Sequence, residues 1–200
     1  MADKFLHNLT LLDPEAAAER KACVLVRDGR IAEVFDDLTV APAASEPVDL
    51  AGCALAPGFI DVHFHGELIF AREDDFGAAL GRTSEALLRE GTTSYLATTV
   101  AFNEPRIRSF VTQCQSEMTQ SRHRGAELLG VHLEGPWINP AMAGAQPSLA
   151  IRPYNDTEDH EILEVAKDSL KLVTLAPECE GVPKLIDALV KAGIVASLGH

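Results

Sequence analysis

The pattern of apolar and polar residues along the chain changes near residue 55. Before that point, short apolar-rich stretches alternate with polar turns, which predicts a β-rich segment. Asp28-Gly29-Arg30 predicts a hairpin turn, because Asp-Gly readily supplies residues with positive φ. Ala41–Pro47, rich in Pro, Ala and Ser, predicts a connector. The strands expected in this segment are His7–Leu12, Ala22–Val26, Ile31–Phe35 and Val48–Cys53.

After residue 55, short β-prone runs alternate with amphipathic stretches of helical period. The expected strands begin at Phe59, Thr92, Ala126, Leu172 and Ile194. The expected helices are Phe76–Glu90, Glu104–Ser121, Glu158–Ser169 and Val182–Lys191, the third capped by Asp156-Thr157. Such alternation with short turns predicts a parallel α/β fold. An open doubly wound sheet and part of a barrel both fit this pattern.

Two histidines close the first of these strands. Phe59, Ile60 and Val62 form an apolar run that ends in His63-Phe64-His65-Gly66. Alternation along a strand places His63 and His65 on one face, where their imidazoles could hold one metal ion. An isolated H-x-H also fits two ordinary half-buried histidines. Asp61 shares this face, where it could orient His63 or pack beneath it.

A carboxylate follows a later strand in the same way. Glu134 comes directly after Val131–Leu133 and precedes Gly135-Pro136. Glu oxygens accompany histidines in catalytic zinc sites, whereas the competing interpretation is a Glu that caps the following turn. His132 lies on the face of Glu134, and we expect it to support the site without binding metal. The proline-rich stretch 135–156 predicts a long loop, in which Trp137 either packs at the rim or stacks on a ligand.

These motifs carry a resemblance to a known family. PGFIDVHFHG, VHLEGPWINP and the terminal SLGH occur in the order found in the N-acetylglucosamine-6-phosphate deacetylases, metal-dependent hydrolases of the amidohydrolase superfamily. The resemblance implies an α/β fold, a partial (β/α)8 (TIM) barrel over residues 55–200. It also implies that residues 1–54 are the N-terminal part of a small β-sandwich.

The resemblance also implies site residues. Glu134 and His200 would bind metal, and His63 and His65 would permit a second ion, giving one or two divalent ions, zinc or iron. The loop residues Ala145 and Gln146 would contact the substrate, although the family usually has His where this chain has Gln146. Glu67–Phe70 also departs from the family's glycine-rich run. An acid/base Asp on an eighth strand would lie beyond residue 200, so we expect a truncated chain that is inactive alone.

Composition narrows the classes of function. The net charge of −13 argues against nonspecific nucleic-acid binding, although an anionic small molecule could still bind in a local cleft. No apolar run approaches the roughly 20 residues of a membrane helix, so no membrane partner is expected. Four widely spaced cysteines without C-x-x-C indicate reduced thiols and a cytoplasmic protein.

The functional hypothesis is metal-assisted hydrolysis of an acetamide on a small-molecule amino-sugar phosphate. The resembled family is commonly dimeric, which implies a homodimer. Gln146 and Glu67–Phe70 keep open a different N-acyl amino-sugar or N-acyl amino-acid hydrolase. A third alternative is a noncatalytic α/β domain with a vestigial metal site.

Overall fold

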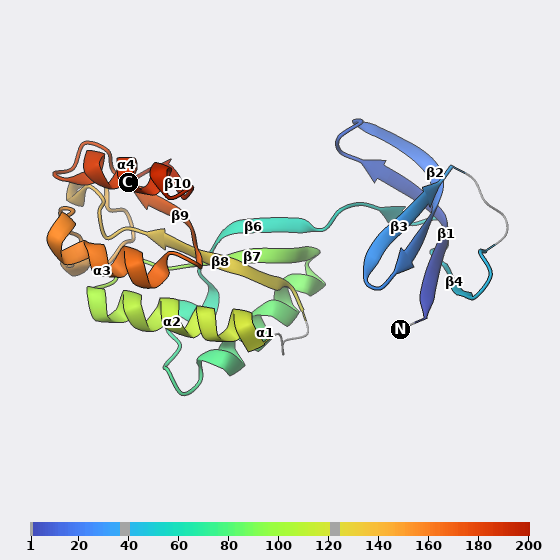
Figure 1. Ribbon diagram of the computed structural model, residues 1–200, viewed down its shortest axis with the longest axis horizontal. Helices are drawn as coiled ribbons and strands as arrows, with labels where there is room; N and C mark the ends of the chain where they lie inside the picture. The colour runs from blue at the N-terminus through green and yellow to red at the C-terminus, as the bar shows by residue number, and fades with distance from the viewer. Residues whose placement is uncertain (1, 37–40, 121–124) are drawn as a thin grey trace. The chain divides into compact units, whose positions relative to one another are not determined.

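The computed structural model describes residues 2–36, 41–120 and 125–200. The chain forms two compact units that divide between Pro57 and Gly58, and each is described by itself. Figure 1 labels their elements. No helix within the described residues is both long and apolar enough to cross a membrane.

The first unit is one mixed five-stranded sheet. Its strands are β1 (Asp3–Asp13), β2 (Ala18–Arg27), β3 (Arg30–Phe35), β4 (Ser45–Asp49) and β5 (Ala54–Leu55). The order is β3-β2-β1-β4, and β5 also pairs with β1. Asp28 and Gly29, both at positive φ, form the predicted hairpin between β2 and β3. The described residues of this unit form a single sheet, so the predicted sandwich is not confirmed and stays a prediction.

The strand expected at Val48–Cys53 is wrong in its bounds. β4 starts inside the predicted connector, at Ser45, and the chain turns at Ala51 and Gly52 before β5. Pro47 is tolerated in β4 because, among the described residues, this strand pairs only with β1, so the missing N–H disrupts no second ladder. Pro47 in the middle of β4 and the turn residues beside it are unfavourable in strands, so the sequence pattern did not indicate this strand.

The second unit alternates strand and helix as predicted. Its strands are β6 (Phe59–Phe64), β7 (Thr92–Thr98), β8 (Glu127–Glu134), β9 (Leu170–Leu175) and β10 (Val195–Leu198). Its α-helices are α1 (Phe76–Arg89), α2 (Glu104–Gln120), α3 (Asp156–Ala166) and α4 (Val182–Lys191). Short 3-10 turns lie at Gly66–Ile69, Pro140–Met142 and Ser148–Ala150. The α/β prediction is confirmed, and Ser121, the expected end of α2, lies outside the described residues.

All five strands of this unit are parallel, in the order β10-β9-β8-β7-β6. Figure 1 shows α1, α2 and α3 lying along one side of the sheet. The core between sheet and helices is built from buried apolar residues such as Leu80, Phe110, Leu133, Ile162 and Leu185. The carboxyl ends of the parallel strands therefore lie together at one end of a well-packed sheet.

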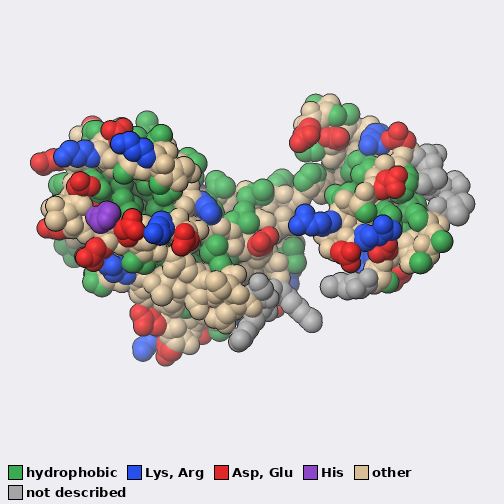
Figure 2. All heavy atoms as spheres, viewed as in Figure 1, with side chains coloured by type: hydrophobic (Ala, Val, Ile, Leu, Met, Phe, Trp, Pro, Cys, Tyr) green, Lys and Arg blue, Asp and Glu red, His purple; other side chains and the backbone are tan. Residues whose placement is uncertain are grey.

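The outer strands of this sheet each have one neighbour. Within the described residues, β6 pairs only with β7, and β10 only with β9. Phe59 and Ile60 on β6 are 72% and 62% exposed, and Leu198 on β10 is 67% exposed. Figure 2 shows hydrophobic side chains gathered along β6. Among the described residues, both outer strands therefore carry exposed apolar side chains and have no strand paired on their outer side.

Candidate metal centre

Residues from β6 and β8 converge at the carboxyl edge of the sheet. The Nε2 atoms of His63 and His65 lie 3.3 Å and 3.1 Å from Oε2 of Glu134, and 3.2 Å from each other. The Glu134 side chain is 4% exposed, while His63 and His65 are 46% and 33% exposed. A buried carboxylate is thus joined by two imidazoles that reach it from the solvent side.

His200 approaches the other oxygen of the same carboxylate. Its Nε2 lies 2.9 Å from Glu134 Oε1, and its backbone carbonyl accepts a hydrogen bond of 2.9 Å from the N–H of Asn139. Asn139 in turn donates from Nδ2 to Glu178 at 2.8 Å, which lowers the pKa of Glu178. Glu134 is therefore shared, with His63 and His65 on one oxygen and His200 on the other.

Carbonyl groups determine which ring nitrogens carry protons. His65 Nδ1 lies 3.3 Å from the Thr98 carbonyl, and His200 Nδ1 lies 3.3 Å from the Met142 carbonyl. Because a carbonyl only accepts, each Nδ1 is the donor, and a neutral ring then has an unprotonated Nε2. In the neutral rings, both Nε2 lone pairs point at the Glu134 carboxylate.

This arrangement fits a divalent cation. Glu134 Oε2 is buried and accepts no hydrogen bond from the described residues. A buried anionic oxygen that faces a nitrogen lone pair, here that of His65 Nε2, is unfavourable unless a proton or cation lies between them. Neutral imidazoles together with a carboxylate are the donors of catalytic zinc sites. The group His63, His65 and Glu134 could therefore hold a metal ion.

Asp61 and His132 surround this group without joining it. The carboxylate of Asp61 accepts a hydrogen bond of 3.0 Å from the backbone N–H of His63, so its contact is with the chain and not with the imidazole. His132 is 1% exposed, and burial, followed by the nearby His63, lowers its pKa to about 4. His132 is therefore neutral near pH 7.

The long loop passes over His200 and the end of β7. Gln146 Oε1 accepts a hydrogen bond of 2.7 Å from the Ala101 N–H, and a side chain added at Gly144 would contact the His200 ring at 3.7 Å. Ala145 is exposed beside them. The predicted substrate residues Ala145 and Gln146 thus lie in the loop that borders the histidines, and their role stays a prediction.

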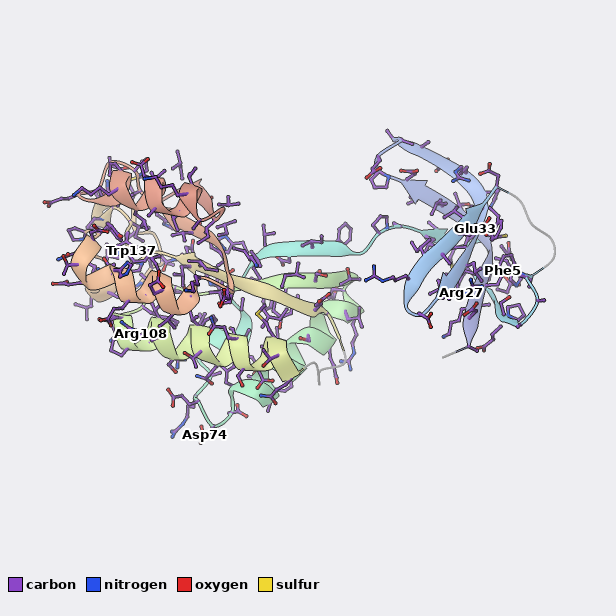
Figure 3. All side chains as sticks on the ribbon, viewed as in Figure 1. Phe5, Arg27, Glu33, Asp74, Arg108 and Trp137 are labelled. Atoms are coloured by element: carbon purple, nitrogen blue, oxygen red, sulfur yellow. The ribbon has the colours of Figure 1, made fainter. Side chains whose placement is uncertain are left out.

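Trp137 is part of the core. It is fully buried, and its Nε1 donates to Asp159 at 2.9 Å, so it packs within the protein and cannot stack on a ligand. Asp159 also accepts hydrogen bonds from both Nη atoms of Arg152 and, at 2.8 Å, from the Asn155 N–H. Figure 3 marks Trp137 beside α3. This hydrogen-bond network, which the sequence pattern did not reveal, holds the two ends of the loop 135–156 together.

Comparisons with known proteins show what the chain as a whole is similar to. Residues 54–192 match the amidohydrolase family. An N-acetylglucosamine-6-phosphate deacetylase from Bacillus subtilis is 35% identical over 100% of this chain and 51% of its own length. An N-acetylgalactosamine-6-phosphate deacetylase from Escherichia coli O157:H7 is 32% identical over 79% of this chain and 43% of its own.

A solved structure extends the comparison to the fold. An N-acetylglucosamine-6-phosphate deacetylase mutant from Mycobacterium smegmatis, in complex with N-acetyl-D-glucosamine-6-phosphate, has a TM-score of 0.79 at 25% identity. The match covers 100% of this chain and 50% of that one. The parallel sheet is therefore half of a barrel of this kind, and the chain spans about half the length of these relatives.

Proposed function

We propose that this chain, which belongs to the amidohydrolase family, supplies the metal centre of a deacetylase. The proposed reaction converts N-acetylglucosamine 6-phosphate to glucosamine 6-phosphate and acetate, the activity named for the Bacillus subtilis relative. The observation that carries the proposal is the buried Glu134 Oε2, which accepts no hydrogen bond from the described residues while two imidazoles face it.

The proposed ligands divide between the two carboxylate oxygens. His63 and His65 would bind an ion together with Oε2 of Glu134, and His200 would bind on the side of Oε1. The first group would hold one ion, zinc or iron, and His200 with the other oxygen of Glu134 would be needed to hold a second. A bound divalent ion would lower the pKa of water from about 15.7 toward 7 and polarise the acetamide carbonyl.

The chain's own groups would prepare this chemistry. The Thr98 and Met142 carbonyls hold Nδ1–H of His65 and His200, which keeps each Nε2 available as a ligand. Burial of Glu134 beneath the histidines keeps its charge poorly hydrated, and therefore strong toward a cation. These features prepare the donors before any ion binds.

Gln146 is proposed to contact the substrate through its amide N–H groups. The Ala101 N–H is a donor, so the atom of Gln146 that contacts it must be the carboxamide oxygen Oε1. The amide nitrogen Nε2 is then the end of the side chain that can face a ligand. Within the described residues, Nε2 has no acceptor among the hydrogen bonds of the protein. The proposed partner is therefore an oxygen acceptor, such as a sugar hydroxyl or phosphate.

Gln146→Glu is expected to raise the KM of the whole enzyme at least about 10-fold and to change kcat less than about threefold. A Glu oxygen can still accept from Ala101, but the second oxygen would repel an acceptor where the amide donates. Steady-state kinetics with the phosphorylated sugar measure both constants. Gln120→Glu, the same charge change at the exposed end of α2, is the matched control; an unchanged KM in Gln146→Glu would contradict the proposed contact.

The test of the proposed function combines metal analysis with a substrate panel. Dialysis of this chain against zinc or ferrous iron should leave at least one ion per chain, and His63→Ala should remove it. The whole protein is then assayed with N-acetylglucosamine 6-phosphate, its dephosphorylated form and N-acetyl amino acids. A chain that binds no metal, or an enzyme that prefers the amino acids, would contradict the proposal.

A second candidate substrate is N-acetylgalactosamine 6-phosphate. The Escherichia coli relative carries that name, and Gln146 departs from the His that the family resemblance implies at this place. The two sugars differ in one hydroxyl configuration, so the ratio of their kcat/KM values decides between them. The homodimer and the cytoplasmic location stay predictions.

A further inference from the structure

His132 connects four strands beneath the candidate metal centre. From β8, its Nδ1 lies 3.0 Å from the Val62 carbonyl of β6 and 3.2 Å from Thr98 Oγ1 of β7. Its Nε2 lies 2.8 Å from Thr174 Oγ1 of β9. β6 and β8 are not neighbours in the sheet, so His132 reaches across β7 to contact β6.

The Val62 carbonyl is available because β6 carries an extra residue there. Asp61 pairs with Tyr95 and Phe64 with Ala97, so three steps along β6 face two along β7. Such a β-bulge leaves backbone groups outside the ladder and redirects the neighbouring side chains. Thr98 Oγ1 accepts from the Phe64 N–H at 2.9 Å, and Asp61 accepts from the His63 N–H. The bulge that carries His63 is therefore held by side chains.

The chemistry of its partners determines how His132 acts. The Val62 carbonyl can only accept, so Nδ1 of His132 donates to it, and Nε2 accepts from the Thr174 hydroxyl. The His63 ring also rests on the His132 ring, with centroids 4.8 Å apart and planes at 83°. Val62 directly precedes His63, so this bond fixes the peptide from which the first imidazole projects.

We propose that His132 is a positioning residue that, by bonding the Val62 carbonyl across β7, holds the β6 bulge so that His63 and His65 point at Glu134. The inference rests on the proposed function, because it concerns the alignment of the same metal ligands. His132 itself does not bind the ion. Its effect reaches the site through the backbone of β6.

Two amide substitutions of His132 test the roles of its two ring nitrogens separately. In His132→Asn the amide nitrogen can replace Nδ1 and keep the Val62 bond, whereas in His132→Gln it can replace Nε2 and keep only the Thr174 contact. The proposal predicts that Asn retains the zinc dissociation constant within about threefold. Gln is expected to weaken zinc binding by about 10- to 100-fold, as when a group that orients a ligand is lost.

Thr174→Val is the control for a purely structural role. It removes the hydroxyl on the side away from β6, so the melting temperature should fall by roughly 2–4 °C while zinc affinity stays within about threefold. Competition dialysis of the 200-residue chain measures the dissociation constants, and thermal melting of the metal-free chain measures stability.

Two results would overturn the positioning role. One is zinc affinity unchanged in a folded His132→Gln; the other is equal loss in His132→Asn and His132→Gln. If His132→Gln does not fold, His132→Asn alone decides, since it must keep near-normal affinity. A wild-type chain that binds no zinc would overturn the proposed function itself, and the positioning role with it.

Discussion

Glu134→Gln is expected to weaken zinc binding by about 100-fold or more without unfolding the protein. The substitution preserves shape but removes the charge that faces the Nε2 atoms of His63 and His65. Zinc centres contribute roughly 10–16 kcal/mol over about four ligands, so one lost ligand corresponds to about 3 kcal/mol. Competition dialysis against a chelator of known affinity measures the change.

The metal-free protein should respond in the opposite direction. In the wild type an imidazole lone pair faces a carboxylate oxygen, whereas the amide N–H of Gln can donate to that lone pair. The free energy of unfolding of metal-free Glu134→Gln should therefore be equal to that of the wild type or higher by up to about 1 kcal/mol. Glu127→Gln, at the exposed opposite end of β8, is the matched control and should change neither quantity. Unchanged zinc affinity in Glu134→Gln would show that this carboxylate is not a ligand.

Asp159→Ala is expected to destabilise the second unit by about 3–5 kcal/mol, which corresponds to a fall of roughly 6–20 °C in its melting temperature. Asp159 is fully buried, and its loss would leave the Trp137 N–H and the Arg152 guanidinium without their acceptor. Arg152, whose side chain is 30% exposed, would keep a poorly hydrated charge without its counter-ion, and the fully buried Trp137 N–H would lose its acceptor. Differential scanning calorimetry measures the effect.

Lys167→Ala provides the matched control for this prediction. Lys167 pairs with Glu164 near the end of α3, and both side chains are more than half exposed. An exposed pair of this kind contributes at most about 1 kcal/mol, so its loss should shift the melting temperature by at most a few degrees. Equal shifts in the two variants would contradict the role assigned to the buried network.

The alternation of strands and helices was predictable because its signals are local. Gly91, at positive φ, follows α1, and Pro105 lies in the first turn of α2, as expected from the sequence. The predicted cap of α3 is wrong: Asn155, and not Asp156 or Thr157, accepts the hydrogen bond from the Thr157 N–H. Adjacent residues of similar capping preference cannot be separated without coordinates.

Only those residues of the candidate site that lie in sequence motifs were predictable. His63, His65, Glu134 and His200 were selected from their sequence context, and the structure places them around one carboxylate. The β6 bulge was not predictable, because it depends on pairing with β7 and on the side chains that satisfy its backbone. Burial of Asp159 was also hidden, since an acidic residue in a helix is ordinarily exposed and its partners lie in a separate loop.

Sharing one carboxylate between two sides has a consequence for metal stoichiometry. Glu134 brings a single negative charge, and His63, His65 and His200 bring none while neutral. A first cation would use most of that charge, so a second would meet repulsion that little else in the group offsets. Loading should therefore be stepwise, with a tight first equilibrium and a much weaker second one, and the number of ions per chain would follow the free metal concentration of the surroundings.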